Sequence, residues 1–181
     1  DGHHLILTGR RRERLEALRD ELARTYPKSR FLALTFDVRR RESVEEAIAS
    51  LPDEWQSIDT LINNAGLAVG LESIHEGDPD DWECMIDTNI KGLLYVTRAV
   101  APGMVARRAG HIVNLGSISS REVYPGGAVY CATKHAVRAL SLTLTQKEVA
   151  YLEEPYRAHE LVGPLARPED APLAGSRTER R

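Results

Sequence analysis

Cysteine is scarce in this sequence, and its scarcity excludes some kinds of site. The 181 residues include only 2 cysteines, Cys84 and Cys131, which are too few and too unpatterned for a disulfide framework or a zinc site. We therefore expect both to be reduced thiols. The histidines show no spacing typical of metal ligands, so no metal site is predicted.

Long hydrophobic runs and an excess of one charge are lacking as well. The longest apolar runs, such as residues 93–96 and 99–101, fall far short of the ~20 residues that cross a bilayer, and no signal-peptide pattern opens the chain. The formal net charge of -3 gives no indication of a nucleic-acid or membrane partner. We expect a cytoplasmic protein.

The residues that are present predict alternating strands and helices. Hydrophobic residues make up 42% and charged residues 28% of the chain, which is typical of one soluble globular domain. Asp78 and Pro79 have the pattern of a helix start, and we expect a kink in the helix that follows, near Asn89 or Pro102, and a stop at Gly110. Apolar runs predict strands at 5–8, 31–36, 58–62 and 111–115, and helical periodicity predicts helices at 11–26, 44–51, 81–108 and 127–150.

This alternation predicts an α/β fold with a doubly wound, Rossmann-like parallel sheet over residues 1–150. Ligands of such sheets bind beyond the carboxyl ends of the strands, so the segments that follow each strand are the places to look for chemistry. From residue 151 to 181 the apolar period disappears and prolines gather, and this tail is predicted to be loop or disordered.

Tyr130 and Lys134 are the first candidates for catalysis. They stand four positions apart in a predicted helix, which places both side chains on one face about a turn apart. A fixed positive charge favours a phenolate, so the lysine would make the phenol more useful for proton transfer. The alternative is an ordinary exposed helix pair. Ser117, after a predicted strand, could donate a hydrogen bond to a substrate oxygen, or it could simply form a turn.

Four motifs in order resemble the short-chain dehydrogenase/reductase family. They are Asn63-Asn64-Ala65-Gly66 after a strand, Asn89 with Gly92 in the next helix, Ser117 after the following strand, and Tyr130-Cys-Ala-Thr-Lys134. The resemblance covers residues 2 to about 146. It implies an enzyme that moves a hydride between a nicotinamide cofactor and a small hydroxyl or carbonyl compound.

The resemblance also assigns catalytic roles. Tyr130 would donate or accept the proton, and Lys134 would lower the pKa of that phenol while bonding the nicotinamide ribose. Ser117 would orient the substrate oxygen. Asn89 would hold a water that extends the proton relay through Lys134, a role compatible with a buried amide bonded to backbone at a helix kink.

Cofactor contacts are implied at two further places. Asn63, Ala65 and Gly66 would shape the cofactor cleft, where small residues permit close backbone approach. Asp37 and Val38 would contact the adenine. For Asp37 the alternative is a helix N-cap.

The choice between NAD and NADP depends on the segment Thr8-Gly9-Arg10-Arg11-Arg12. An enzyme that prefers NAD would carry an acidic residue here for the ribose diol, whereas guanidinium groups can bond a 2′-phosphate in fork geometry. NADP is therefore predicted, with Arg10 and Arg11 as its ligands. The alternative is a solvated basic first turn of a helix.

Further motifs narrow the resemblance to the NADP-dependent 3-hydroxy acid dehydrogenases, which oxidise serine and allo-threonine and typically form homotetramers. These are Leu51-Pro52-Asp53-Glu54-Trp55, Asp81-Trp82-Glu83 and Met85-Ile86-Asp87-Thr88-Asn89.

Compared with a complete member, the domain is expected to be truncated at both ends. The first strand and the glycine-rich pyrophosphate loop are missing before Asp1-Gly2-His3-His4, and residues 151–181 match no family element. The missing strand would be central in the sheet, so its neighbours would either stay apart or close up and expose apolar edges. The competing hypothesis is a weakly active or inactive fragment that serves as an interaction module through its helices at 81–108 and 127–150.

Overall fold

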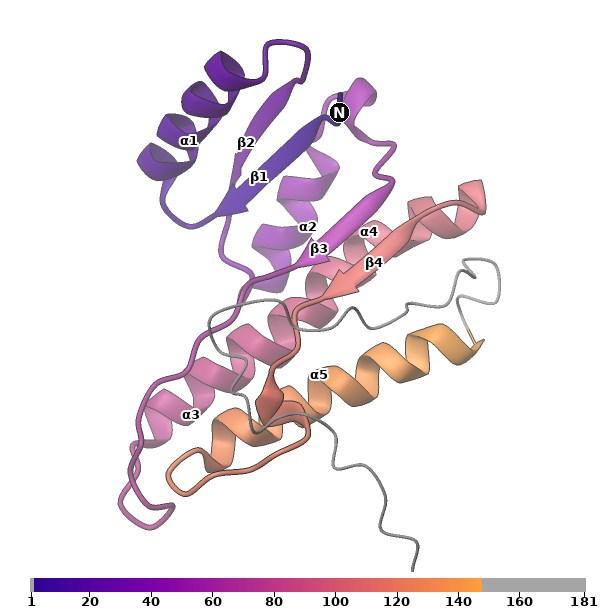
Figure 1. Ribbon diagram of the computed structural model, residues 1–181. Coiled ribbons are helices and arrows are strands. Elements are labelled where there is room, and N and C mark those ends of the chain that lie inside the picture. Colours follow the sequence, from indigo (N-terminus) through magenta and orange to yellow (C-terminus); the bar gives the residue numbers. More distant parts are fainter. Residues whose placement is uncertain (1, 148–181) are drawn as a thin grey trace, which may run out of the picture.

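The computed structural model describes residues 2–147, which form alternating strands and helices (Figure 1). The four predicted strands and the helices between them are confirmed. In chain order the elements are β1 (Leu5–Gly9), α1 (Arg12–Thr25), β2 (Phe31–Thr35), α2 (Arg41–Ala49), the 3-10 turn η1 (Asp53–Trp55), β3 (Thr60–Asn63), α3 (Pro79–Ile86), the π-helical turn η2 (Asp87–Gly92), α4 (Leu93–Arg107), β4 (His111–Asn114), the 3-10 turn η3 (Ile118–Ser120) and α5 (Ala128–Lys147).

The strands are parallel, as predicted, but they form two separate pairs. β1 pairs with β2, with Leu5 opposite Phe31, and β3 pairs with β4, with Asn63 opposite Asn114. All four strands run the same way in Figure 1, in the order β2, β1, β3, β4 across the view. No ladder joins β1 to β3 within the described residues.

The strands are unusually exposed for a parallel sheet. Such sheets normally have both faces covered, and their strands are hydrophobic because they are buried. Here no strand residue among those described is fully buried, and Ile62 of β3 is 60% exposed. The described residues therefore leave hydrophobic strand side chains exposed that a parallel sheet would normally bury.

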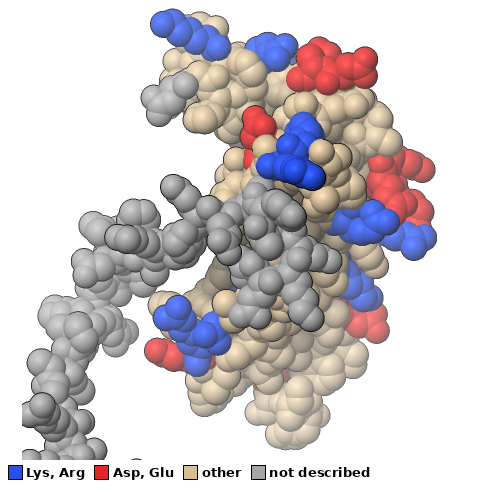
Figure 2. Space-filling model, turned by 90° about the vertical axis from the view of Figure 1, so that its right-hand side faces the viewer, with Lys and Arg blue, Asp and Glu red and all other residues tan. Residues whose placement is uncertain are grey.

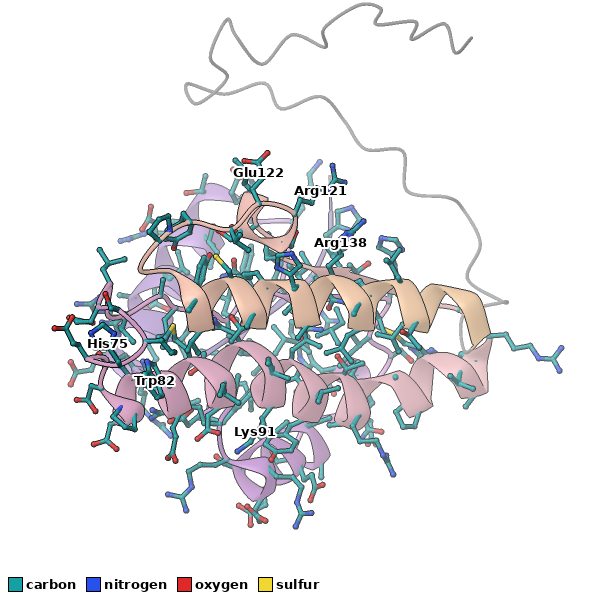
Figure 3. All side chains as sticks on the ribbon, turned by 90° about the horizontal axis from the view of Figure 1, so that it is seen from below. His75, Trp82, Lys91, Arg121, Glu122 and Arg138 are labelled. Atoms are coloured by element: carbon teal, nitrogen blue, oxygen red, sulfur yellow. The ribbon has the colours of Figure 1, made fainter. Side chains whose placement is uncertain are left out.

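The core lies among the helices that back the strands. α2 packs against α4, α3 and η2 pack against α5, and α4 also packs on β3. Figure 3 shows α5 lying alongside the continuous helical rod of α3, η2 and α4. The buried apolar residues are Phe36, Val44, Leu51, Met85, Leu93, Val100, Met104, Cys131 and Val137.

Most element boundaries follow the predictions, with small shifts. The Asp78 side chain accepts a hydrogen bond from the backbone amide of Asp80 and Pro79 begins α3, which confirms the predicted helix start. The predicted stop at Gly110 is wrong, because Arg108 takes the left-handed conformation (φ 54°) that ends α4. Gly110 serves packing instead: a Cβ there would lie 2.5 Å from the Cγ of Met104.

The surface carries both charges. On the face shown in Figure 2, Lys and Arg side chains alternate with Asp and Glu side chains across the described surface. Cys84 and Cys131 are both free thiols. Helices among the described residues are too short or too polar to cross a membrane. The tail at 151–181 lies outside the described residues.

Candidate active site

The predicted catalytic pair occupies the first turns of α5. Lys134 is only 7% exposed, and its Nζ lies 6.0 Å from the centroid of the half-buried Tyr130 ring. The Lys134 Nζ donates a 2.9 Å hydrogen bond to the Leu115 carbonyl, at the carboxyl end of β4. The lysine is therefore not the exposed partner of a surface pair: it connects α5 to the end of a strand.

Asn89 sits in the π-helical turn η2, which interrupts the long helix where a kink was predicted. Its side chain is 2% exposed. The Asn89 Oδ1 accepts from the Leu67 amide at 2.9 Å, and its Nδ2 donates to the Leu67 carbonyl at 2.9 Å and to the Thr133 Oγ1 at 3.0 Å. Short π-helical segments are frequent at functional sites. Here the segment aims a buried amide that fastens the loop after β3 to α5.

Gly66 shows that Asn89 and Lys134 border one small space. A Cβ placed on Gly66 would lie 3.4 Å from the Asn89 Oδ1 and 3.6 Å from the Lys134 Nζ. The loop after β3, η2 and α5 thus meet at one point. The structure brings together three residues that the sequence analysis selected from distant parts of the chain.

Ser117 lies beyond β4, close to the point where Lys134 is anchored. It is half-buried and caps η3, its Oγ accepting from the Ser119 amide at 3.2 Å. η3 packs on α5. Ser117 therefore does form a turn, as the alternative interpretation predicted. The bond from Ser119 occupies only an acceptor position of the Ser117 hydroxyl.

Asp37 lies at the carboxyl end of the other strand pair, and its carboxylate is held by Arg39. The helix N-cap alternative is wrong, because α2 begins after Arg40 and has no side-chain cap. The Arg39 guanidinium lowers the pKa of the Asp37 carboxyl chiefly through its hydrogen bond, with burial opposing and the Arg10 charge adding a smaller effect. Arg10 and Arg11 are exposed at the turn after β1.

Val38 brings the end of β2 close to η2, the turn that carries Asn89. A Cβ placed on Gly92 would lie 2.8 Å from the Val38 Cγ2. The glycine of the Asn89–Gly92 motif is therefore required by the close approach of the segment that follows β2.

Asn63 connects the two strands of the second pair and the helices behind them. Its Nδ2 donates to the Thr97 Oγ1 at 3.0 Å and to the Asn114 Oδ1 at 2.8 Å, and the Asn114 Nδ2 continues to the Ser141 Oγ at 3.0 Å. This chain of polar groups links β3, β4, α4 and α5. Ala65, two residues later, is exposed.

Three contributors were missed by the sequence analysis: Thr133, Asn114 and Arg39. Thr133 lies between Tyr130 and Lys134 in the sequence and is only 1% exposed. This burial marks it as a contributor, but it becomes visible only in the three-dimensional structure. Arg39 belongs to a run of charged residues that reads as a solvated surface.

A small cavity adjoins Tyr130 at the start of α5. It has room for about 20 Å³, roughly the space of one water molecule. Carboxylates and an indole ring contribute to its wall, and Figure 3 shows Trp82 at the same end of the helical pair. The lining residues include Val69, Gly70, Glu72, Asp81, Trp82, Met85 and Tyr130. Within residues 2–147 no three His, Cys, Asp or Glu side chains gather as metal ligands would.

This chain is similar in sequence to a protein family and to characterised relatives. Residues 1–152 match the family described as short chain dehydrogenase. The NADP-dependent 3-hydroxy acid dehydrogenase YdfG of Salmonella typhi is 56% identical over 144 residues, which cover 80% of this chain and 56% of the relative. Serine 3-dehydrogenase of Rhizobium radiobacter is 44% identical over 144 residues, covering 80% and 55%. The chain thus spans just over half the length of these relatives.

Solved structures of similar proteins share this fold. Serine dehydrogenase from Escherichia coli superposes with a TM-score of 0.74 at 55% identity, over 79% of this chain and 63% of that one. The closed form of serine dehydrogenase complexed with NADP+ gives a TM-score of 0.72 at 55% identity, over 79% and 56%. The resemblance inferred from the four motifs is confirmed, and the chain belongs to the short chain dehydrogenase family.

Proposed function

We propose that this chain is an NADP-dependent oxidoreductase that moves a hydride between NADP and a small hydroxyl or carbonyl compound, with 3-hydroxy acids such as serine and allo-threonine as substrates. The observation that carries the proposal is the buried Lys134 ammonium, anchored on the Leu115 carbonyl and placed 6.0 Å from the Tyr130 ring. The names of the similar dehydrogenases support the cofactor and the substrate class.

The residues present suit both ends of NADP. An ammonium has three N–H donors, and the Leu115 carbonyl uses one at Lys134, so two are left for ribose hydroxyls. At the other end, exposed Arg10 and Arg11 suit a 2′-phosphate. Asp37 and Val38 are proposed to meet the adenine.

The middle of the cofactor cleft is proposed to run past the loop after β3. Ala65 and Gly66 are exposed and small, so the backbone there can be approached closely. Asn63 supports this stretch through its bonds to Thr97 and Asn114.

The proton step belongs to the chain's own side chains. In the oxidising direction the Tyr130 oxygen takes the proton of the substrate hydroxyl, with the Lys134 ammonium 6.0 Å from the Tyr130 ring. The Ser117 hydroxyl receives a bond from Ser119 and keeps its own O–H to donate to the substrate oxygen. Bound NADP supplies the acceptor for the hydride that leaves the carbinol carbon.

Asn89 contributes by position. Its amide fixes Leu67 and Thr133, which keeps the space around Lys134 in shape. The water that would extend the proton relay from Lys134 stays a prediction.

The test is NADPH formation by the 181-residue chain with serine, allo-threonine and 3-hydroxypropionate, followed by absorbance. Tyr130→Phe is expected to lower kcat by about 10²-fold or more, because it removes the acid/base group. Tyr26→Phe, at an exposed position after α1, is the matched control and should leave kcat unchanged. A Tyr130→Phe protein as active as the Tyr26→Phe protein would refute the mechanism.

The same assay also tests the competing hypothesis of an inactive fragment. A folded wild-type chain that neither binds NADPH nor oxidises any of the three acids would favour an interaction module instead. Assembly into a homotetramer and a cytoplasmic location also stay predictions, and light scattering of the purified chain checks the first.

A further inference from the structure

A second cavity lies where α2 packs on α4 (Figure 1), away from the candidate active site. Its volume is about 250 Å³. Ile58 precedes β3, whereas Lys134 is anchored beyond the end of β4, and these two strands are parallel. The cavity and the catalytic pair therefore lie at opposite ends of the second strand pair. The apolar residues that line the cavity are Ile48, Ala49, Leu51, Ile58, Ala99 and Val100.

The base of this cavity is buried, and the turn beside it is held by hydrogen bonds. Leu51 is 4% exposed and Val100 is 5% exposed. Gln56, which also lines the cavity, donates through its Nε2 to the Leu51 carbonyl at 3.2 Å and to the Asp53 Oδ1 at 3.2 Å. Both hydrogens of the Gln56 amide are thereby used. These bonds fasten η1 to the end of α2, so the apolar space is bounded by elements that are bonded to one another.

Arg107 brings a positive charge to the rim of the cavity. Its Nη2 donates to the Ile58 carbonyl at 2.8 Å, and a Cβ placed on Gly103 would lie 3.2 Å from its Nη1. Ile58 and Gly103 both line the cavity. A guanidinium has five N–H donors, and the bond to Ile58 uses one of them. Within residues 2–147 no Asp or Glu forms an ion pair with Arg107, so the exposed guanidinium can accept an anion.

We propose that this cavity binds a medium-chain monocarboxylate, with the alkyl chain against Leu51 and Val100 and the carboxylate on Arg107. Volume and charge select this class of ligand. An apolar cavity of about 150 Å³ is enough to bind benzene, so the larger space here suits a chain of about six to eight carbons. A guanidinium binds a carboxylate in fork geometry, whereas a neutral lipid gives it no charge to pair with. The site is separate from the proposed function and does not depend on it.

The test is calorimetric titration of the 181-residue chain with octanoate. Each methylene that is buried should strengthen binding by up to about fourfold, so the affinity should rise from butanoate to octanoate. Octanol has the same chain without the charge and should bind about fivefold more weakly than octanoate. A surface that merely collects apolar molecules would bind octanol at least as well, and that result would overturn the proposal.

Two variants and a control locate the bound octanoate. Ala99→Leu fills the apolar space and should weaken octanoate binding more than about tenfold. Arg107→Gln removes the charge and should weaken octanoate about fivefold while leaving octanol unchanged. Arg98→Gln removes the same charge from an exposed position of α4 that does not line the cavity, and it should leave both affinities unchanged. If Ala99→Leu does not fold, Ala49→Leu replaces it at an exposed position of the lining.

The outcomes are independent of dehydrogenase activity. Octanoate binding that is lost in Ala99→Leu and weakened in Arg107→Gln, but not in Arg98→Gln, supports the site. A folded wild-type chain that does not bind octanoate overturns the proposal, whatever that chain does with NADPH. Binding that serine displaces, or that the cavity-filling variant leaves intact, also overturns it, because the octanoate would then lie elsewhere. Equal weakening in the two arginine variants overturns it as well, because net charge would explain the effect.

Discussion

The contact between Gly92 and Val38 joins the segment after β2 to the helical turn η2, and a single methyl group tests it. In Gly92→Ala the new Cβ would lie 2.8 Å from the Val38 Cγ2 and 3.0 Å from the Val38 Cβ. Valine is stiff about χ1, so its methyl groups cannot simply rotate away. Either the segment after β2 or the helical turn must move.

Two effects of opposite sign set the expected magnitude. Overpacking a filled site costs about 1–3 kcal/mol, whereas replacing a helical glycine by alanine gains about 1 kcal/mol. Gly92→Ala alone should therefore lower the free energy of unfolding by about 1 kcal/mol. In a Val38→Ala background the 2.8 Å contact is gone but the contact with the residue-38 Cβ at 3.0 Å remains, so the same substitution should cost clearly less than it does with Val38. The coupling between the two sites is then about 1 kcal/mol.

Urea unfolding of the four proteins of this double-mutant cycle measures the coupling. The m-values should agree, because none of the changes alters the surface exposed on unfolding. If Gly92→Ala cost the same free energy with Val38 and with Ala at that position, the contact would not limit packing and the reasoning would be refuted.

Two further changes follow from polar contacts. Arg39 holds the pKa of Asp37 below its ordinary value of 3.8, so the stabilisation from this pair is present above that pH and is lost as the pH falls through the lower pKa of the folded state. In urea unfolding, the stability advantage of wild type over Asp37→Asn should therefore be constant above about pH 5 and shrink toward about pH 2. An advantage that grows on acidification would contradict this. Asn63→Ala should cost about 1–3 kcal/mol because it leaves Thr97 and Asn114 without their donor, whereas the exposed neighbour Asn64→Ala should cost under about 0.5 kcal/mol; equal costs would deny the polar chain its role.

Much of the fold was predictable because the signals are local. Apolar runs and helical periodicity gave the strands and helices, and Asp78 with Pro79 marked a helix start through chemistry confined to a few residues. The end of α4 was not predictable in this way. A non-glycine residue, Arg108, takes the left-handed position, while Gly110 is kept small by contact with Met104.

The catalytic candidates were found because their order along the chain is distinctive, but their contacts were not. The π-helical form of η2 accompanies the tertiary bonds of Asn89 to Leu67 and Thr133, which no local pattern encodes. Arg39 was missed for a related reason. A run of charged residues does not reveal which member turns back to grip a neighbouring carboxylate.

The division of the strands into two pairs sets Asp37 apart from the anchor of Lys134. Asp37 follows β2 in one pair, and Lys134 is anchored where β4 ends in the other. Within residues 2–147 the two pairs are connected by the packing of α2 on α4 and by the contact of Val38 with Gly92. Changes of a methyl group at these contacts would therefore shift Asp37 relative to the anchor of Lys134.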